Sequence, residues 1–347
     1  MRERKTKAQL LKYAHDETKV PTGLERHYLN VVNVLEPSGV EIETIEFGIP
    51  GARGLKNLLK EGFFGPLVRT LQGRGKVDVY HATYEMLGVF FPFVRAKRIV
   101  SIHHMVNKDE GNGRLWHTLW RISSAISMRF ADHVLAISSK TRDDVVRRYG
   151  IPSEKVTVVT FPQDPAFRVL GLEKGKVLGS MGTLNARKNH QAAIRVFSEV
   201  LKTPGNGDCV LRIVGKGLLL DELKELVSSL GVSDRVSFES DLPLEGLVEF
   251  YNTCAAVLNT SSKEGLGLAT LEAQACGTPV VFFRDADIPP EVTEAAVPCA
   301  DEAEMVAEVV KILNDPDHAR RLIERGLEFT SADNGFREKL LRLYEPS

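Results

Sequence analysis

Residues Ser261–Val281 read SSKEGLGLATLEAQACGTPVV, a glycine-rich turn that passes into a helix-like run and then into β-branched residues. This order of loop, helix and strand is typical of one repeating unit of a parallel α/β sheet. Glu264 and Glu272 stand eight positions apart in this otherwise apolar stretch. A buried carboxylate needs donors or a cation. The pair therefore indicates either a site that binds hydroxyl groups next to a phosphate or two glutamate side chains that point to solvent on an exposed face.

Short β-rich runs alternate with helical runs over the whole chain, which predicts an α/β fold with two Rossmann-like, doubly wound parallel sheets. Strands are expected at residues 8–14, 41–47, 77–83, 98–104, 133–138, 151–159, 176–182, 209–215, 235–240, 255–261 and 278–283. A segment rich in proline and glycine near residues 162–176 reads as a linker. We therefore expect domains at residues 1–165 and 166–325, followed by a helical tail at residues 326–347.

The composition is that of an ordinary soluble protein, with 43% hydrophobic and 26% charged residues among 347. No run approaches the ~18–20 apolar residues that span a bilayer, and no secretory signal is evident. The four cysteines have no metal or redox spacing, so we expect reduced core residues of a cytosolic protein. They are Cys209, Cys254, Cys276 and Cys299.

The near-neutral net charge hides an asymmetry between the two halves. Residues 1–170 contain 26 Lys and Arg against 18 Asp and Glu, or +8, and the remainder contains 19 against 28, or −9. The basic half is compatible with an anionic surface or an acidic substrate. Random variation of surface charge explains the split about equally well.

Three loops of the second half follow predicted strands, where open parallel sheets bind ligands. Gly182–His190, GTLNARKNH, places Arg187 and Lys188 at the start of a helix, an arrangement suited to a diphosphate. Taken alone, the loop is better explained as a solvated basic turn. Gly215–Gly217, GKG, matches no phosphate-binding motif, and a tight turn is its more economical explanation. The third loop, at Glu264, can accept hydrogen bonds from sugar hydroxyls, while glycines let backbone amides approach the ligand.

These residues resemble a known family. EGLGLATLEAQACGTPVV is similar to the E-x7-E signature of retaining GT-B glycosyltransferases of family four, and GTLNARKN resembles that family's arginine-lysine loop. RIVSIHHMV resembles its strand that ends in a histidine, and PTGLERHYLNVV its glycine-rich loop and first helix. The resemblance implies a GT-B fold in which an acceptor domain and a nucleotide-sugar domain face a cleft, with the C-terminal helix packing back on the first domain.

The resemblance also implies a role for each matching residue. The donor-binding set is Gly23, Gly182, Arg187, Lys188, Gly265, Leu266, Gly267 and Glu272, and the catalytic pair is His103 and Glu264. Arg187 and Lys188 would neutralise the diphosphate, Glu264 would orient the sugar, and Glu272 would bind the ribose. No metal and no cofactor are expected, apart from a UDP- or GDP-linked sugar as co-substrate. The chain departs from the family in reading PTG for paired glycines and His103-His104 for a His-Asp pair.

The predicted function is therefore retaining transfer of a hexose, mannose or glucose, to a hydroxyl of a glycan or lipid-linked acceptor. Alternatives are a nucleotide-sugar epimerase and a non-catalytic protein that binds the nucleotide sugar. Two basic and apolar stretches, residues 53–76 and 86–98, suit peripheral contact with an anionic membrane at its inner, cytoplasmic face. Core helices and a buried turn explain them equally well, and no nucleic-acid partner is expected.

Overall fold

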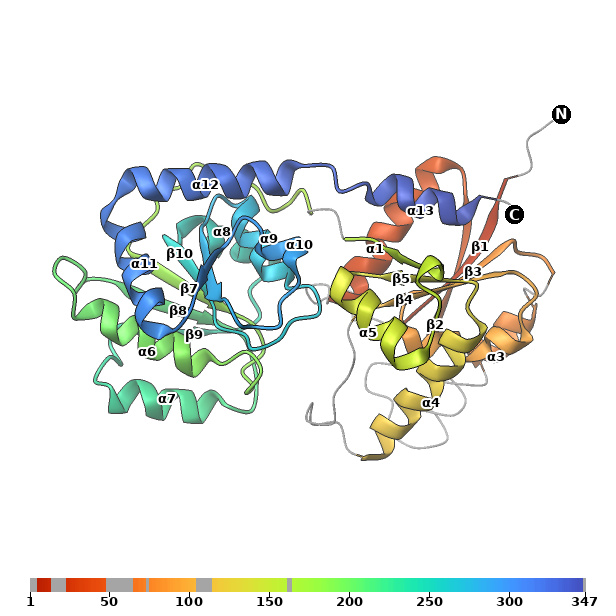
Figure 1. Cartoon of the computed structure of the whole chain (residues 1–347), viewed down its shortest axis with the longest axis horizontal. Helices are drawn as coiled ribbons and strands as arrows, with labels where there is room; N and C mark the ends of the chain where they lie inside the picture. The colour runs from red at the N-terminus through yellow and green to blue at the C-terminus, as the bar shows by residue number, and fades with distance from the viewer. Residues whose placement is uncertain are drawn as a thin grey trace. The chain divides into compact units, whose positions relative to one another are not determined.

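The computed structural model describes residues 5–13, 23–47, 65–72, 75–103, 114–160 and 164–345. The chain divides into two compact units (Figure 1). Unit 1 comprises Met1–Pro162 together with Asp333–Ser347, and unit 2 comprises Gln163–Ala332. The last helix of the chain thus belongs to the unit in which the chain begins.

The described strands of unit 1 form a parallel sheet in the order β2-β1-β3-β4-β5-β6. They are β1 (Lys7–Tyr13), β2 (Glu41–Phe47), β3 (Val79–Ala82), β4 (Lys97–Ile102), β5 (His133–Ala136) and β6 (Val156–Val158). The helices are α1 (Gly23–Leu35), η1 (Glu36–Ser38), α3 (Gly65–Gln72), η3 (Glu85–Phe93), α4 (Arg114–Phe130), α5 (Ser139–Tyr149), η4 (Ser153–Lys155) and α13 (Phe336–Tyr344). The central strands β3 and β4 are buried on both faces, as parallel sheets require.

Unit 2 contains a second parallel sheet in the order β12-β11-β10-β7-β8-β9. Its strands are β7 (Val177–Met181), β8 (Val210–Val214), β9 (Val236–Glu239), β10 (Ala256–Asn259), β11 (Val280–Phe283) and β12 (Val297–Cys299). Its helices are α6 (His190–Leu201), α7 (Leu220–Ser229), α8 (Leu244–Thr253), α9 (Leu268–Ala275), α10 (Pro290–Thr293), α11 (Glu302–Asn314) and α12 (Pro316–Ser331). The predicted α/β class with two parallel sheets is confirmed.

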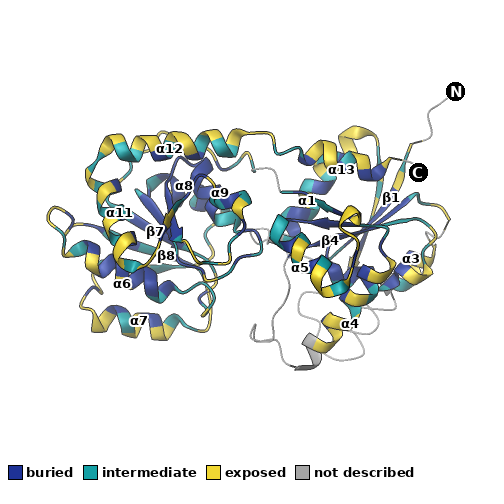
Figure 2. Cartoon of the chain, viewed as in Figure 1, coloured by how far each residue is buried: buried dark blue, intermediate teal, exposed yellow. Residues whose placement is uncertain are grey.

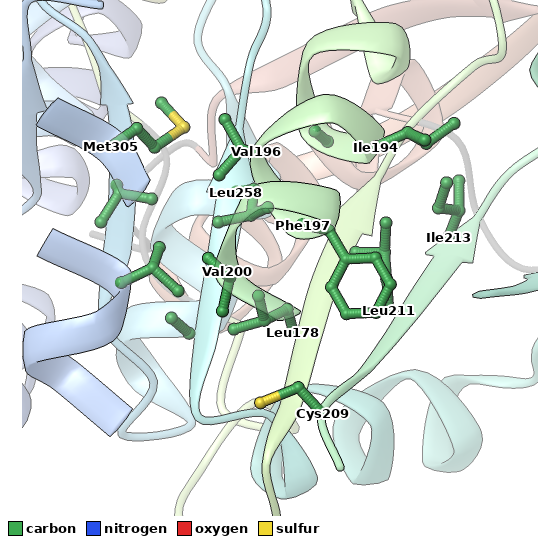
Figure 3. Packing of buried hydrophobic residues seen from close by; sticks show 14 of the residues in the cluster. Leu178, Ile194, Val196, Phe197, Val200, Cys209, Leu211, Ile213, Leu258 and Met305 are labelled. Carbon is green, nitrogen blue, oxygen red and sulfur yellow. The ribbon is translucent and has the colours of Figure 1, made fainter. Parts of the chain in front are cut away.

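The core of unit 2 lies between its sheet and the helices that cover it (Figure 2). In Figure 3 the α6 side chains Phe197 and Val200 lie beside the sheet residues Leu211 and Leu178, and Ile194 belongs to the same cluster. This packing fixes α6, and with it the loop that precedes α6, against the ends of β7 and β8. All four cysteines are buried and form no disulfide.

The structure differs from the sequence prediction in two details. The edge strand β12 was not expected. The tail, expected to be helical throughout, breaks after α12, and α13 starts behind Gly335 with a left-handed φ of 68°. For residues 86–98 two explanations were open, and the structure favours core packing, because Phe90 and Phe91 are buried in η3. Residues 53–64 and 73–74 of the other basic stretch lie outside the described residues.

Candidate functional site

Loop Gly182–His190, called here the Arg-Lys loop, joins β7 to α6 at the carboxyl end of the unit 2 sheet. Gly182 has a φ of 141°, and a Cβ there would lie 2.7 Å from Cε of Lys188. Only glycine therefore lets the lysine side chain fold back over the loop. Asn189 adopts a left-handed conformation just before α6, with a φ of 48°. The loop presents Arg187 and Lys188 immediately in front of the helix N-terminus.

Both cations of the loop bind the carboxylate of Glu264. Nη1 of Arg187 donates to Oε2 of Glu264 at 2.8 Å, and Nζ of Lys188 donates to Oε1 at 2.5 Å. The Ser261 hydroxyl donates to the same Oε1 at 2.6 Å. Three donors from two loops thus bind one side chain. Lys188 lies 76 residues before Glu264 in the sequence. The structure brings this predicted acid and both predicted cations into direct contact.

The cluster is largely shielded from water. The side chains of Glu264 and Lys188 are 7% and 13% exposed, while that of Arg187 is 35% exposed. Burial alone would raise the pKa of Glu264, but the charges of Lys188 and Arg187 outweigh it and hold that pKa below 4.5. The carboxylate is therefore ionised at neutral pH, and it neutralises both cations of the loop.

The GKG turn supports the Arg-Lys loop from behind. A Cβ on Gly215 would lie 1.9 Å from the carbonyl oxygen of Gly182, and one on Gly217 would lie 2.2 Å from that of Leu184. The Lys216 carbonyl accepts from the Leu184 amide at 2.8 Å. Both glycines are thus required by close backbone approach, in agreement with the structural explanation of this motif.

His190, the first residue of α6, anchors the loop to the sheet. Its Nδ1 lies 2.9 Å from the Ser180 hydroxyl, and its Nε2 lies 3.3 Å from the Gly182 carbonyl oxygen. Burial, reinforced by the charge of Lys188, lowers the pKa of His190 to about 4. A neutral imidazole can donate from Nε2 to Gly182 and accept at Nδ1 from Ser180, so His190 is a structural support at neutral pH.

Glu272 lies on α9, eight positions beyond Glu264. It is 5% exposed, and its Oε2 accepts from the Tyr251 hydroxyl at 2.9 Å. Gly267 introduces α9 with a φ of 92°, and the neighbouring Leu266 is buried. Neither carboxylate of the motif therefore points to solvent, and each is held by a different part of unit 2.

The remaining predicted residues lie in unit 1. His103 follows β4 and is 6% exposed; its ring packs edge-to-face on His27, with centroids 4.8 Å apart. Gly23 is the first residue of α1. Thr22 and His104, the two departures from the family pattern, lie outside the described residues. Among the described residues, no group of three His, Cys, Asp or Glu side chains could hold a metal ion.

The sequence analysis missed three residues of this site: Ser261, Tyr251 and His190. His190 closes the quoted loop and could have been suspected from its place at the helix start. Tyr251 carries no local signal, because it lies 21 positions before the carboxylate it binds. Hydrogen bonds between residues that are distant in sequence can be identified only once the fold is known.

Two family profiles together match most of the chain. The profile described as Glycosyltransferase Family 4 matches residues 21–165, and that described as Glycosyl transferases group 1 matches residues 163–329. Their junction lies close to the division between the two units.

Curated relatives match part of the chain. A D-inositol 3-phosphate glycosyltransferase of Acidothermus cellulolyticus is 35% identical over 181 residues, which are 47% of this chain and 40% of the relative. The enzyme of the same name from Nocardia farcinica is 30% identical over 226 residues, which are 59% of this chain and 49% of the relative. The matches span about half or less of these relatives' lengths.

Solved structures match the fold over nearly the whole chain. Anabaena Alr3699/HepE, solved in complex with UDP and glucose, has a TM-score of 0.71 at 16% identity and covers 98% of this chain and 97% of its own. Sucrose-phosphate synthase from Thermosynechococcus elongatus has a TM-score of 0.73 at 16% identity, with 97% of both chains covered. At this identity the likeness shows the GT-B fold alone.

Proposed function

The chain belongs to the group 1, family 4 glycosyltransferases, and on this premise we propose that it transfers a hexose from a nucleoside-diphosphate sugar to an acceptor hydroxyl with retention of configuration. The observation that carries the proposal is the contact of Arg187 and Lys188 with Glu264. Two cations and one acid, all at the carboxyl end of one parallel sheet, are the groups that such a donor requires.

The proposed step breaks the bond between the anomeric carbon and the diphosphate oxygen and forms a bond from that carbon to the acceptor oxygen. The acceptor proton goes to an oxygen of the departing diphosphate. Negative charge grows on these oxygens during the step, so fixed cations stabilise the transition state more than the ground state. Arg187 and Lys188 supply those cations once the diphosphate displaces the carboxylate from them.

Glu264, released from part of its ion pairing, then accepts hydrogen bonds from the transferred sugar. Glu272, held by Tyr251, is proposed to bind the ribose, and the amides of Gly265–Gly267 the donor. His103 in unit 1 is proposed to contact the sugar, by resemblance. UDP-glucose is proposed as the first donor to test, because a solved protein of the same fold was crystallised with UDP and glucose.

The acceptor is proposed to be an anionic, phosphorylated polyol, either free or as a lipid headgroup. Two observations favour this chemistry: the first 170 residues carry a net charge of +8, and the relatives quoted above are named for D-inositol 3-phosphate. Assays with soluble inositol phosphate and with vesicles of phosphatidylinositol separate the two sources.

The test of the function follows nucleotide release from a panel of UDP- and GDP-sugars, with and without acceptor. Glu264→Ala and Lys188→Ala are expected to lower turnover at least about a hundredfold, the scale of one lost transition-state contact. Arg195→Ala is the matched control, because Arg195 lies on α6 and pairs with Glu302 at the surface. Near-normal turnover in both site variants would overturn the site assignment.

The same panel separates the alternatives. An epimerase converts the donor into a second sugar nucleotide without acceptor, and a non-catalytic binding protein releases no nucleotide. Transfer requires both release of the nucleotide and incorporation of the sugar into acceptor.

We further propose peripheral contact of α4 with an anionic membrane from the cytoplasmic side. Leu119 and Ile122 are 52% and 55% exposed, and Phe130, the last residue of α4, is 39% exposed. Figure 2 shows exposed positions along α4. Arg121 and Arg129 flank them, and α4 contains no acidic residue. Apolar side chains between arginines suit the headgroup region of an anionic bilayer. None of the described helices is long and apolar enough to cross a membrane.

Vesicle co-sedimentation tests this contact. Binding to vesicles with 30–40% phosphatidylglycerol is expected at low salt, and little binding to pure phosphatidylcholine, on the order of tenfold less. The double variant Leu119→Gln/Ile122→Gln should lose binding, whereas Leu230→Gln, which changes an exposed leucine of unit 2, should keep it. Equal sedimentation of all three proteins would exclude α4 as the contact.

A further inference from the structure

Three histidines of unit 1 lie buried close to one another. His27 comes from α1, His81 from β3, and His103 follows β4; they are 2%, 0% and 6% exposed. The ring centroids of His27 and His81 are 6.3 Å apart, and those of His27 and His103 are 4.8 Å apart. The proposed function uses only His103, so the other two need an explanation.

A chain of hydrogen bonds connects His81 and His27 to the last helix. The Tyr344 hydroxyl on α13 lies 2.6 Å from Nδ1 of His81. Nε2 of His81 lies 2.8 Å from the Ser101 hydroxyl, which in turn lies 2.7 Å from Nε2 of His27. His27 then packs edge-to-face on His103, at an interplanar angle of 83°. The chain thus runs from α13 through the sheet to the predicted catalytic residue.

Proton positions along this chain depend on one another. The single Ser101 hydroxyl hydrogen can be donated to one histidine only, so Ser101 must accept from the other. If Tyr344 donates to Nδ1 of His81, then His81 donates from Nε2 to Ser101, and Ser101 donates to His27. Burial lowers the pKa of His81 to about 3 and lowers that of His27 as well, so both rings are neutral and have defined tautomers.

We propose that Tyr344 is a positioning residue for His103: through His81, Ser101 and His27 it fixes the ring against which His103 packs. The proposal deepens the proposed function and rests on the role of His103 in it. An edge-to-face pair is directional, since the positive edge of one ring meets the negative face of the other. A His27 ring held in one tautomer and one orientation therefore restricts His103 to one orientation.

Several contacts besides the phenol hydroxyl dock α13. Leu340 and Phe336 are buried, the Arg337 guanidinium donates to the Ser38 hydroxyl at 3.0 Å, and Lys97 donates to the Glu345 carbonyl at 3.1 Å. Tyr344→Phe keeps the ring and these contacts while removing one hydrogen-bonding group. The variant therefore separates positioning from folding.

The first experiment compares steady-state kinetics of Tyr344→Phe with those of the wild type. We expect kcat to fall about tenfold, the scale of one hydrogen bond, with the KM for donor changed less than twofold. Tyr80→Phe is the matched control. Tyr80 precedes His81 on β3, so it points to the opposite face, and its buried hydroxyl bonds Thr70 instead. This control should keep its kcat.

A second measurement does not depend on activity. Imidazole 15N shifts of His81 and His27, assigned with single histidine variants, report the tautomer of each ring. Tyr344→Phe is expected to change them and to move the ring-proton shifts of His103, whereas Tyr80→Phe leaves all of them unchanged. Unchanged shifts in Tyr344→Phe would overturn the positioning role whatever the kinetics show.

A double variant separates failure of this inference from failure of the proposed function. In a His103→Ala background, Tyr344→Phe should have no further effect on kcat, because its effect passes through His103. A further tenfold loss there would overturn the inference while transfer itself stands. Full activity of His103→Ala would instead remove His103 from the reaction, and the inference with it.

Discussion

Replacing Glu264 by glutamine removes one negative charge and keeps the size of the side chain, so the variant isolates what the carboxylate does. In the structure this carboxylate neutralises Arg187 and Lys188 and accepts from Ser261. Without it, a lysine side chain that is only 13% exposed loses its counter-charge. We therefore expect the ligand-free variant to be less stable, yet to bind free UDP more tightly than the wild type.

The size of the effect follows from burial. Leaving one partner of a buried ion pair uncompensated costs about 3–5 kcal/mol, while the more exposed Arg187 adds at most about 1 kcal/mol. For a unit of 170 residues, Gln163–Ala332, this total of about 3–6 kcal/mol lowers the Tm by roughly 6–24 °C. In the variant the diphosphate no longer has to displace a carboxylate from Arg187 and Lys188. The Kd for UDP should therefore fall about tenfold, equivalent to about 1.4 kcal/mol.

Calorimetry with and without UDP measures both quantities, and Glu302→Gln, at the surface pair with Arg195, is the matched control with an expected loss below about 1 kcal/mol. The pH dependence adds a check. The pKa of Glu264 is held below 4.5 in the folded state, so its stabilisation is present above pH 4.5 and is lost as the pH falls through the folded pKa. A variant with the same Tm as the wild type and no tighter UDP binding would contradict this reasoning. It would show that the Glu264 carboxylate does not compete with the diphosphate for Arg187 and Lys188.

Tyr251→Phe should weaken UDP binding about tenfold without changing kcat at saturating donor, because it frees the Glu272 carboxylate; titration calorimetry measures this, and a normal Kd would contradict it. His190→Gln should flatten the pH dependence of stability: the wild type should lose about 3 kcal/mol between pH 6.5 and 4, since the unfolded state takes up a proton there and the folded His190, with its pKa near 4, does not. Urea denaturation across that pH range measures the free energy of unfolding of both proteins. If it changes with pH equally in the wild type and in His190→Gln, the role given to His190 is excluded. Gly217→Ala should cost about 1–3 kcal/mol and displace the Arg-Lys loop, whereas Gly207→Ala, with open space around it, should be tolerated; equal thermal stability would contradict the close approach.

Most of the fold could be predicted because its strands are short apolar runs between helical runs. β12 escaped prediction for a physical reason: it is a three-residue edge strand with Pro298 at its centre, and proline is tolerated only where a strand has a free edge. The break before α13 depends on the left-handed conformation of Gly335, which sequence periodicity does not reveal. For the aromatic run in η3 the sequence left membrane contact and core packing open, and tertiary packing buries Phe90 and Phe91.

The site was predictable where residue type and loop position coincide, as for Arg187, Lys188 and Glu264. What the sequence did not predict is that these three bind one another, so that the acid already occupies the cations. Contacts with Ser261 and Tyr251 depend on side chains whose hydroxyls are unremarkable in sequence. The roles of the predicted residues in transfer stay predictions until the variants above are measured.

Unit 1 is made of two stretches of chain with Gln163–Ala332 between them. A ribosome adding about 5–20 residues per second needs roughly 10–30 s to synthesise that interval, and unit 2 is complete before α13 has been made. During this time unit 1 lacks Leu340 and Tyr344, which are buried in the complete structure. The middle of the nascent polypeptide can therefore mature before its beginning does. Chaperones that bind exposed apolar surface would therefore find it on the first stretch of unit 1, not on unit 2, which is synthesised later.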